Sequence, residues 1–288
     1  MRPHLQCVTS SIVTLWLASC VEFPEPLPEP LDCADEGVDC LPPGMLLVPA
    51  GEFVMGSNIE NDELPTRGVY VDNYFIDETE VTVAAYAACV DSESCESPEM
   101  GPGCNWEMDG RAEHPVNCVT WFQAEEYCRW VDDGMKRLPT EAEWEKAARS
   151  TDARKYPWGD IEGPTCEYAV IEDPSGGRAG CGTGGTMTVG AKPAGASPYG
   201  VQDMVGNVGE WVGDWYGDSY GGLSGGNPTG PREGTVRVWR GGSWASSPAL
   251  GELNGSPLRA AKRESSAPDL KSAEVGFRCV RTTLVQPK

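Results

Sequence analysis

The sequence has few basic residues for its length. It contains 22 Lys and Arg against 44 Asp and Glu, so its formal net charge is −22. No basic run interrupts this acidic background. Such a chain repels the phosphate backbone, and nucleic acid is therefore excluded as an expected partner. The acidity fits a soluble surface or a protein that meets cations.

Histidine is also scarce, with two residues in the chain. The lack of any CxxC pair argues further against structural zinc. No GxSxG elbow is present, and a Ser–His–Asp triad would have to use His114, whose place before a proline is more typical of a structural hydrogen bond. "GCGTGG" (180–185) matches GxGxxG, but neither a strand nor a helix flanks it. We interpret it as a loop held by a disulfide between Cys166 and Cys181.

No apolar run is long enough to span a bilayer. A short apolar stretch over 11–18 follows Arg2, and Leu-Ala-Ser precedes Cys20, which together indicate a lipoprotein-type signal peptide over 1–19. On this interpretation Cys20 carries a lipid, and the protein is exported and anchored by that lipid in a bacterial cell envelope, periplasmic or at the surface. The alternative is an ordinary secretory peptide cut near Ala18.

Residues 20–43 are rich in Pro and Glu and are expected to form an extended tether. Cys33 and Cys40 could close a small loop within it. If Cys7 leaves with the signal peptide and the first cysteine of the tether is acylated, ten of the twelve cysteines remain. In an exported chain this even number indicates a disulfide framework of up to five bridges. Three pairings stay open for the four residues Cys89, Cys95, Cys104 and Cys118.

The domain expected over 44–288 mixes strands and helices. Alternation of apolar and polar residues predicts strands within 45–76, and a first helix follows them. Capping boxes predict two further helices near the middle of the chain, beginning at Thr120 and Thr140. After residue 150, glycine-rich turns join short apolar runs. The fold class is therefore a loop-rich α+β domain.

The stretch "DMVGNVGEW" (203–211) offers oxygen ligands of two kinds. Asp203 and Glu210 carry carboxylates, and the turn between them can direct the backbone carbonyls of Gly206 and Val208 inward. Hard cations bind such mixed oxygen sets on irregular backbone, and calcium is plentiful outside cells. The stretch therefore indicates a calcium site, and the alternative is a turn whose acids face water.

Several segments together resemble the formylglycine-generating enzyme (sulfatase-modifying factor) family, whose domain is an elaborated C-type-lectin-like fold. The matching segments follow the family's order over roughly residues 44–282: "MLLVPAGEFVMGS", "HPVNCVTWFQAEEYC", "KRLPTEAEWEKAAR", "YPWGD", "GVQDMVGNVGEW", "RGGSW" and "GFRC". The resemblance implies this fold for the chain, stabilised by disulfides.

The resemblance also has implications for calcium binding and for one disulfide. The four oxygen-bearing positions named above match the family's second calcium site, so the resemblance implies calcium as a cofactor. Its other calcium site begins with an Asn where Val170 stands, which puts that site in doubt. The family pairs cysteines at the positions of Cys128 and Cys279. Closing so long a loop would stabilise the fold by about 4–5 kcal/mol in the chain-entropy model.

The catalytic members carry a pair of cysteines whose thiolates bind copper(I) and activate oxygen. The matching positions here are Ser246 and Gly251, and their segment contains no cysteine. Cu(I) requires soft sulfur ligands, so copper is not expected, and no catalytic residue is assigned. The groove would be bordered by Ser243 and Trp244, and Gly209 stands where the family has a tryptophan.

These observations favour a lipid-tethered, non-catalytic recognition or scaffold module with a glycan or protein ligand. Aromatic residues near the expected groove could stack on such a ligand: Trp211, Trp215, Tyr216, Trp239 and Trp244. One alternative is a formylglycine-generating-type oxidoreductase that oxidises a protein cysteine. The other is a structural envelope protein in which calcium and disulfides serve stability alone.

Overall fold

The computed structural model describes residues 41–160, 163–222, 225–248 and 257–283. The chain divides into two units, residues 1–40 and 41–288, and the description below concerns the second. The expected signal peptide, the lipidated cysteine and all but the last three residues of the expected tether lie outside the described residues. The same holds for Cys20, Cys33, Cys40 and Gly251.

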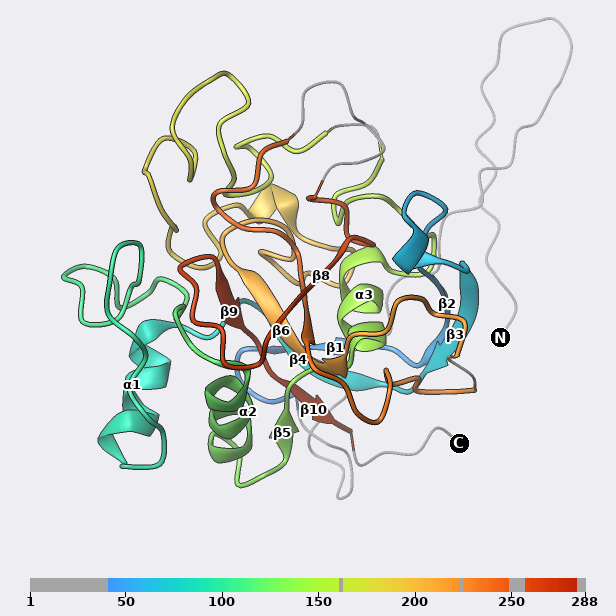
Figure 1. The fold of residues 1–288 in the computed structure, drawn as a ribbon, viewed down its shortest axis with the longest axis horizontal. Coiled ribbons are helices and arrows are strands. Elements are labelled where there is room, and N and C mark those ends of the chain that lie inside the picture. Colours follow the sequence, from blue (N-terminus) through green and yellow to red (C-terminus); the bar gives the residue numbers. More distant parts are fainter. Residues whose placement is uncertain (1–40, 161–162, 223–224, 249–256, 284–288) are drawn as a thin grey trace, which may run out of the picture. The chain divides into compact units, whose positions relative to one another are not determined.

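Two four-stranded sheets form the framework of the domain (Figure 1). The first is antiparallel throughout, in the order β1 (Met45–Val48), β4 (Tyr74–Asp77), β10 (Val280–Thr282) and β5 (Lys136–Arg137). The second has the order β8 (Arg263–Ser266), β7 (Arg237–Arg240), β6 (Gly209–Trp215) and β9 (Val275–Phe277). In it β6 and β9 are parallel and the other pairs antiparallel.

A two-stranded ribbon and three α-helices complete the regular structure. The ribbon pairs β2 (Gly51–Met55) with β3 (Arg67–Val71). The α-helices are α1 (Val83–Asp91), α2 (Trp121–Trp130) and α3 (Glu141–Arg149), and short 3₁₀ turns are η1 (Asn61–Glu63) and η2 (Pro193–Gly195). Both expected capping boxes are present, so the predicted helix starts are confirmed. No helix among the described residues is long and apolar enough to cross a membrane.

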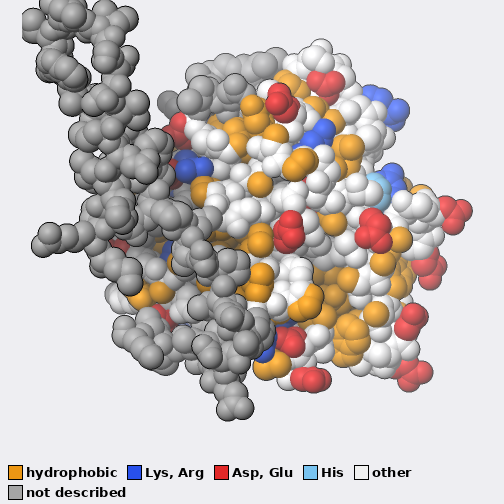
Figure 2. All heavy atoms as spheres, turned by 180° about the vertical axis from the view of Figure 1, so that it is seen from behind, with side chains coloured by type: hydrophobic (Ala, Val, Ile, Leu, Met, Phe, Trp, Pro, Cys, Tyr) orange, Lys and Arg blue, Asp and Glu red, His pale blue; other side chains and the backbone are white. Residues whose placement is uncertain are grey.

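The loops are as extensive as the glycine-rich second half predicts. Within the described part, no α-helix follows α3, and the segment from residue 150 to β6 holds η2 as its one helical turn. These loops, drawn in yellow-green to yellow, form one side of the domain (Figure 1). On the face shown in Figure 2, acidic side chains are scattered between apolar ones rather than gathered in one patch. The fold is the loop-rich α+β class expected from the sequence.

Four disulfides cross-link the described residues. Cys128 of α2 is joined to Cys279, and Cys166 to Cys181, which are the two pairs that the sequence analysis expected. The pairing left open is resolved as Cys89–Cys95 and Cys104–Cys118. All eight cysteines of the described residues are thereby oxidised, since four bonds use eight sulfur atoms.

Helix α3 is buried on every side, although five of its nine residues are charged. Its apolar side, with Trp144, Ala147 and Ala148, packs in the core as its periodicity predicts. Its charged side is buried as well, because Glu141 and Glu145 form ion pairs with Arg240 of β7. The helix is therefore packed between the ribbon and the second sheet rather than lying on the surface.

Candidate functional site

The serines of the expected groove are held by hydrogen bonds to their own surroundings. Ser243 is fully buried, and its Oγ donates to Glu274 Oε2 at 2.5 Å. The backbone N–H of Ser243 donates to Ser246 Oγ at 2.9 Å. Trp244 Nε1 donates to the carbonyl of Ala273 at 3.0 Å. Ser246, where the resemblance led us to expect the first catalytic cysteine of the family, thus holds an alcohol engaged in a loop contact.

His114 does not serve these serines. Its Nδ1 lies 2.9 Å from both Arg111 Nη1 and Thr186 Oγ1, and neither partner is a carboxylate that could orient a catalytic imidazole. Burial, with a smaller contribution from the Arg111 cation, lowers the pKa of His114 to about 4. The ring is therefore neutral at physiological pH and acts as a structural hydrogen-bonding group.

The glycine that replaces the groove tryptophan is covered by another aromatic ring. Gly209 begins β6, and a Cβ built there would lie 2.4 Å from Cε3 of Trp239. The Trp239 indole therefore occupies the space that a side chain at 209 would need. Trp239 Nε1 also donates to Ser266 Oγ at 3.2 Å, which fixes the ring in place.

The aromatic residues expected around the groove do not gather at one place. Trp211 is fully buried and belongs to the core beneath α2. Trp215 and Tyr216 lie at the opposite end of β6 from Gly209, which a strand of seven residues places about 20 Å away. Trp239 and Trp244 are therefore the two members of the set that remain beside the groove.

The expected calcium ligands lie in one region, but their carboxylate oxygens differ in how many hydrogen bonds they already accept. Asp203 has a positive φ of 57°, and its Oδ2 accepts a hydrogen bond from the N–H of Gly190 at 2.5 Å. Glu210 is fully engaged on one oxygen, because Oε2 accepts from Arg278 Nε at 2.7 Å and from Trp144 Nε1 at 2.8 Å. Its Oε1 accepts from Arg278 Nη2 at 2.7 Å. Glu210 thus acts first as the counter-ion of Arg278.

A carboxylate that sequence reasoning missed lies beside Asp203. Glu80 is 2% exposed, and its buried carboxyl group lies against that of Asp203. Apart from Asp203, its oxygens have no hydrogen-bond partner among the described residues. Burial raises the pKa of both Glu80 and Asp203, and the negative charge of Asp203 raises that of Glu80 further. Glu80 stands in a loop between β4 and α1 without any local pattern that marks it. Its role depends on a neighbour more than a hundred residues away.

Comparison with known proteins decides the family. The model of the sulfatase-modifying factor enzyme 1-like domain matches residues 34–283. The chain belongs to this family. Mouse (Mus musculus) formylglycine-generating enzyme is 32% identical over 284 residues, covering 82% of this chain and 74% of that protein. A Chlamydia pneumoniae protein named serine/threonine-protein kinase pkn1 is 35% identical over 256 residues, covering 82% of this chain and 38% of its own length.

A solved structure supports the same assignment. PvdO from Pseudomonas aeruginosa aligns with a TM-score of 0.70 and 26% identity, covering 83% of this chain and 94% of that one. The fold is thus the elaborated C-type-lectin-like fold of the sulfatase-modifying factor family. The chain spans 38% of the length of the pkn1 relative.

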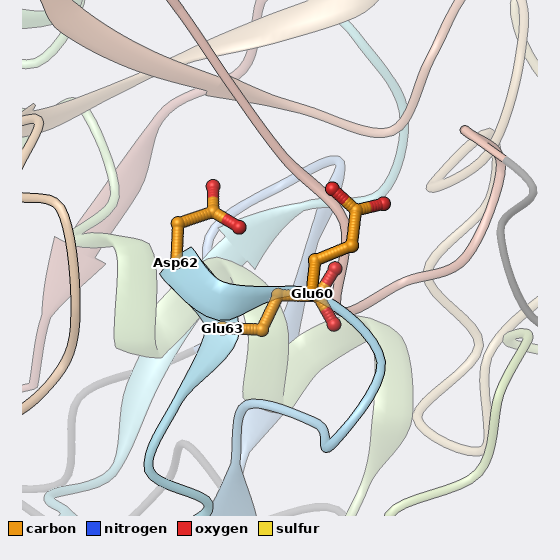
Figure 3. A group of neighbouring side chains, drawn as sticks. All are labelled: Glu60, Asp62 and Glu63. Carbon is orange, nitrogen blue, oxygen red and sulfur yellow. The ribbon is translucent and has the colours of Figure 1, made fainter.

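Two other positions fit metal binding poorly in this family member. Val170 contributes backbone alone, since its carbonyl accepts from the N–H of Asn207 at 2.8 Å. The acidic group formed by Glu60, Asp62 and Glu63 has carboxylate oxygens within 4.8 Å of one another (Figure 3). Glu60 and Glu63 form ion pairs with Arg259 and Lys262, and the Asp62 carboxylate accepts a hydrogen bond from the Tyr216 hydroxyl. Glu60 and Glu63 therefore act as counter-ions of these two cations.

Proposed function

We propose that this member of the sulfatase-modifying factor family is an exported, lipid-tethered recognition or scaffold module without oxidase activity. The observation that carries the proposal is that the described residues contain no free cysteine thiol. Ser246 stands where the resemblance places a metal-binding cysteine, and every cysteine of the described residues is in a disulfide. A thiolate pair for Cu(I) is therefore lacking in this part of the chain. The disulfides also support an oxidising, exported location.

The decisive experiment counts thiols and copper together. We expect the purified native protein to show no free thiol with Ellman's reagent, no retained Cu(I), and no conversion of a cysteine peptide to an aldehyde. The matched positive control is the double variant Ser246→Cys/Gly251→Cys, which restores sulfur at both positions. Stoichiometric Cu(I) binding with peptide oxidation by the unmodified protein would instead establish the alternative.

That alternative is a formylglycine-generating-type oxidoreductase, and the relationship to the mouse enzyme is what favours it. It would require one of the assigned disulfides to open and present thiolates at the groove. The Ser243–Glu274 and Ser246 contacts leave the groove with hydroxyl groups instead. A structural envelope role is the third possibility, and binding of a ligand distinguishes it from recognition.

We propose in addition that calcium stabilises the module. The fit rests on the buried carboxyl groups of Glu80 and Asp203, which lie against each other and of which Glu80 has no other hydrogen-bond partner among the described residues. The carbonyls of Gly206 and Val208 would complete an oxygen set, and Glu210 retains one oxygen able to join it. The ion would neutralise buried negative charge that otherwise opposes folding.

Calcium should therefore raise the melting temperature. At a calcium concentration about 100 times the Kd, the stabilisation is about 2.7 kcal/mol, or roughly 5–10 °C for a domain of this size. We expect Glu80→Gln and Asp203→Asn each to remove most of the shift, measured by calorimetry with calcium and with chelator. The exposed Asp269→Asn is the control and should keep it. An identical melt in calcium and chelator would rule the site out.

A further inference from the structure

A cavity of about 640 Å³ lies at the end of β6 opposite to the groove. It is bordered by the last strand residues Gly213 to Trp215, by the start of α2 at Trp121, and by residue 237 of β7. Its volume is within the range of small-molecule sites. It is separate from the groove and from the calcium ligands, since about 20 Å of strand lies between Trp215 and Gly209.

The cavity contains an arginine that the fold holds rigidly. Arg237 lies directly opposite Trp215 in the β6–β7 ladder, and its guanidinium is 3.5 Å from the centre of that indole. On its other side, the Trp121 ring centre is 3.7 Å away. Nη1 donates to the carbonyl of Gly213 at 2.7 Å, and Trp121 Nε1 is fixed by the carbonyl of Val212 at 2.7 Å. The cation is thus preorganised between two aromatic faces.

This arginine has no anionic partner among the described residues. It forms no ion pair there, and its Nε is buried without a hydrogen bond. Desolvation lowers its pKa, with Glu125 and Asp214 as weaker opposing influences. Partly buried charges are normally paired, so a guanidinium left unpaired beside a cavity points to an anion supplied from outside.

The acidic residues that line the cavity differ from Arg237 in that their carboxylates have hydrogen-bond donors. Those among the described residues already accept hydrogen bonds: Asp72 from Asn227, Glu125 from Arg129, Glu143 from Arg137, and Asp214 from the N–H groups of Glu141 and Gly230. Burial raises the pKa of Asp214 to about 7, so that carboxyl carries only part of its charge at neutral pH. Among the described lining residues, Arg237 and the exposed Arg232 are cations without an ion pair, and Asp72 is an acid whose hydrogen-bond partner, Asn227, is neutral.

The remaining lining combines apolar residues, such as Leu138 and Pro231, with uncharged polar ones. Amide and hydroxyl side chains such as Asn73, Thr229 and Thr282 face the same cavity. These side chains suit a ligand rich in hydroxyl groups. The two nearby indoles already stack on the Arg237 guanidinium, so their faces are not free to stack on a ligand. The ligand class that satisfies all these groups is a carboxylate that carries several hydroxyls.

We propose that this cavity, defined by Arg237, Trp121 and Trp215, binds a sugar acid, either free or as a unit of a glycan. The Arg237 guanidinium pairs with the carboxylate of the sugar, and the neutral side chains receive its hydroxyls. The inference rests on the recognition function proposed above and names its ligand class and site. No covalent step is involved.

Isothermal titration calorimetry and ligand-observed NMR with galacturonate and glucuronate test the proposal. Both should bind, while the methyl ester of galacturonate and neutral galactose should bind at least 10-fold more weakly. We expect Arg237→Gln to weaken binding of galacturonate by about 10- to 100-fold, the value of a charge-assisted hydrogen bond. The exposed Arg232→Gln should weaken it about threefold without risk to folding. Arg154→Gln, an arginine outside the cavity, is the matched control.

The other outcomes either overturn the proposal or identify the source of the sugar acid. Absence of binding at about 10 mM sugar acid, or equal binding of acid and ester, removes the ligand class. Unchanged affinity in a folded Arg237→Gln variant and in Arg232→Gln removes the site. Binding of an acidic peptide in place of the sugar acid assigns the cavity to a protein ligand. Oligogalacturonate that binds more tightly than the monomer identifies a glycan as the source. None of these results alters the thiol and copper counts on which the lack of oxidase activity rests.

Discussion

Replacement of Cys128 and Cys279 by alanine is expected to lower the free energy of unfolding by about 5 kcal/mol. The bond spans 151 residues and joins α2 to the turn before β10, so its removal releases most of the domain in the unfolded chain. Both cysteines are fully buried within an aromatic cluster that includes Tyr127 and Phe277. The double variant leaves no unpaired thiol. Urea unfolding followed by circular dichroism measures the loss.

The Cys89–Cys95 bond provides the matched comparison. It spans only six residues, for which the same model gives about 2 kcal/mol. A Cys89→Ala/Cys95→Ala variant should therefore remain clearly more stable than the Cys128/Cys279 variant. Equal losses in the two variants would mean that native packing, rather than the length of the closed loop, sets the contribution of the long-range bridge.

The second large effect is expected for Glu141→Gln, at about 3–5 kcal/mol of stability. The Glu141 carboxylate is buried and accepts from Arg240 Nη1 at 2.9 Å, from Arg263 Nε at 2.7 Å and from the hydroxyl of Tyr220 at 3.0 Å. Glutamine keeps the shape but removes the charge. Two buried guanidinium groups then face a neutral amide. Glu125→Gln is the control, because its pair with Arg129 is largely exposed and should contribute less than about 0.5 kcal/mol.

The pH dependence of this loss gives an independent check. Burial alone would raise the pKa of Glu141, but Arg263 and Arg240 outweigh it, so the pKa lies below its usual 4.5. The stability due to this ionised group is present above pH 4.5 and disappears as pH falls through the lower folded pKa. The difference between the parent and Glu141→Gln should therefore shrink in acid. A difference that stays constant from pH 7 to pH 3 would contradict the assigned charge.

Local sequence patterns were sufficient for the elements but not for their surroundings. Capping boxes at Thr120 and Thr140 determine where α2 and α3 begin, since the partners are three residues apart. The same pattern gives α3 a polar side that suggests a surface helix. Its acids are instead buried against Arg240 and Arg263, which are 99 and 122 residues from Glu141 in the chain. No property of the helix itself contains that information.

In the candidate sites, too, some features follow from single residues and others from contacts between distant residues. The lack of cysteine between Cys181 and Cys279 is visible in the sequence, because it concerns which residues are present. The covering of Gly209 by Trp239 depends on the register of two strands. The buried carboxyl pair of Glu80 and Asp203 and the sandwiched Arg237 depend on contacts between distant loops and strands. Chemistry that belongs to one residue could be predicted, and chemistry that arises from neighbours could not.

The placement of β1 and β10 on either side of β4 has a mechanical consequence. Both strands are antiparallel to β4, so they run parallel to each other near the two ends of the described domain. A force that pulls those ends apart would load the hydrogen bonds along the strands, so that they resist together instead of unzipping one at a time.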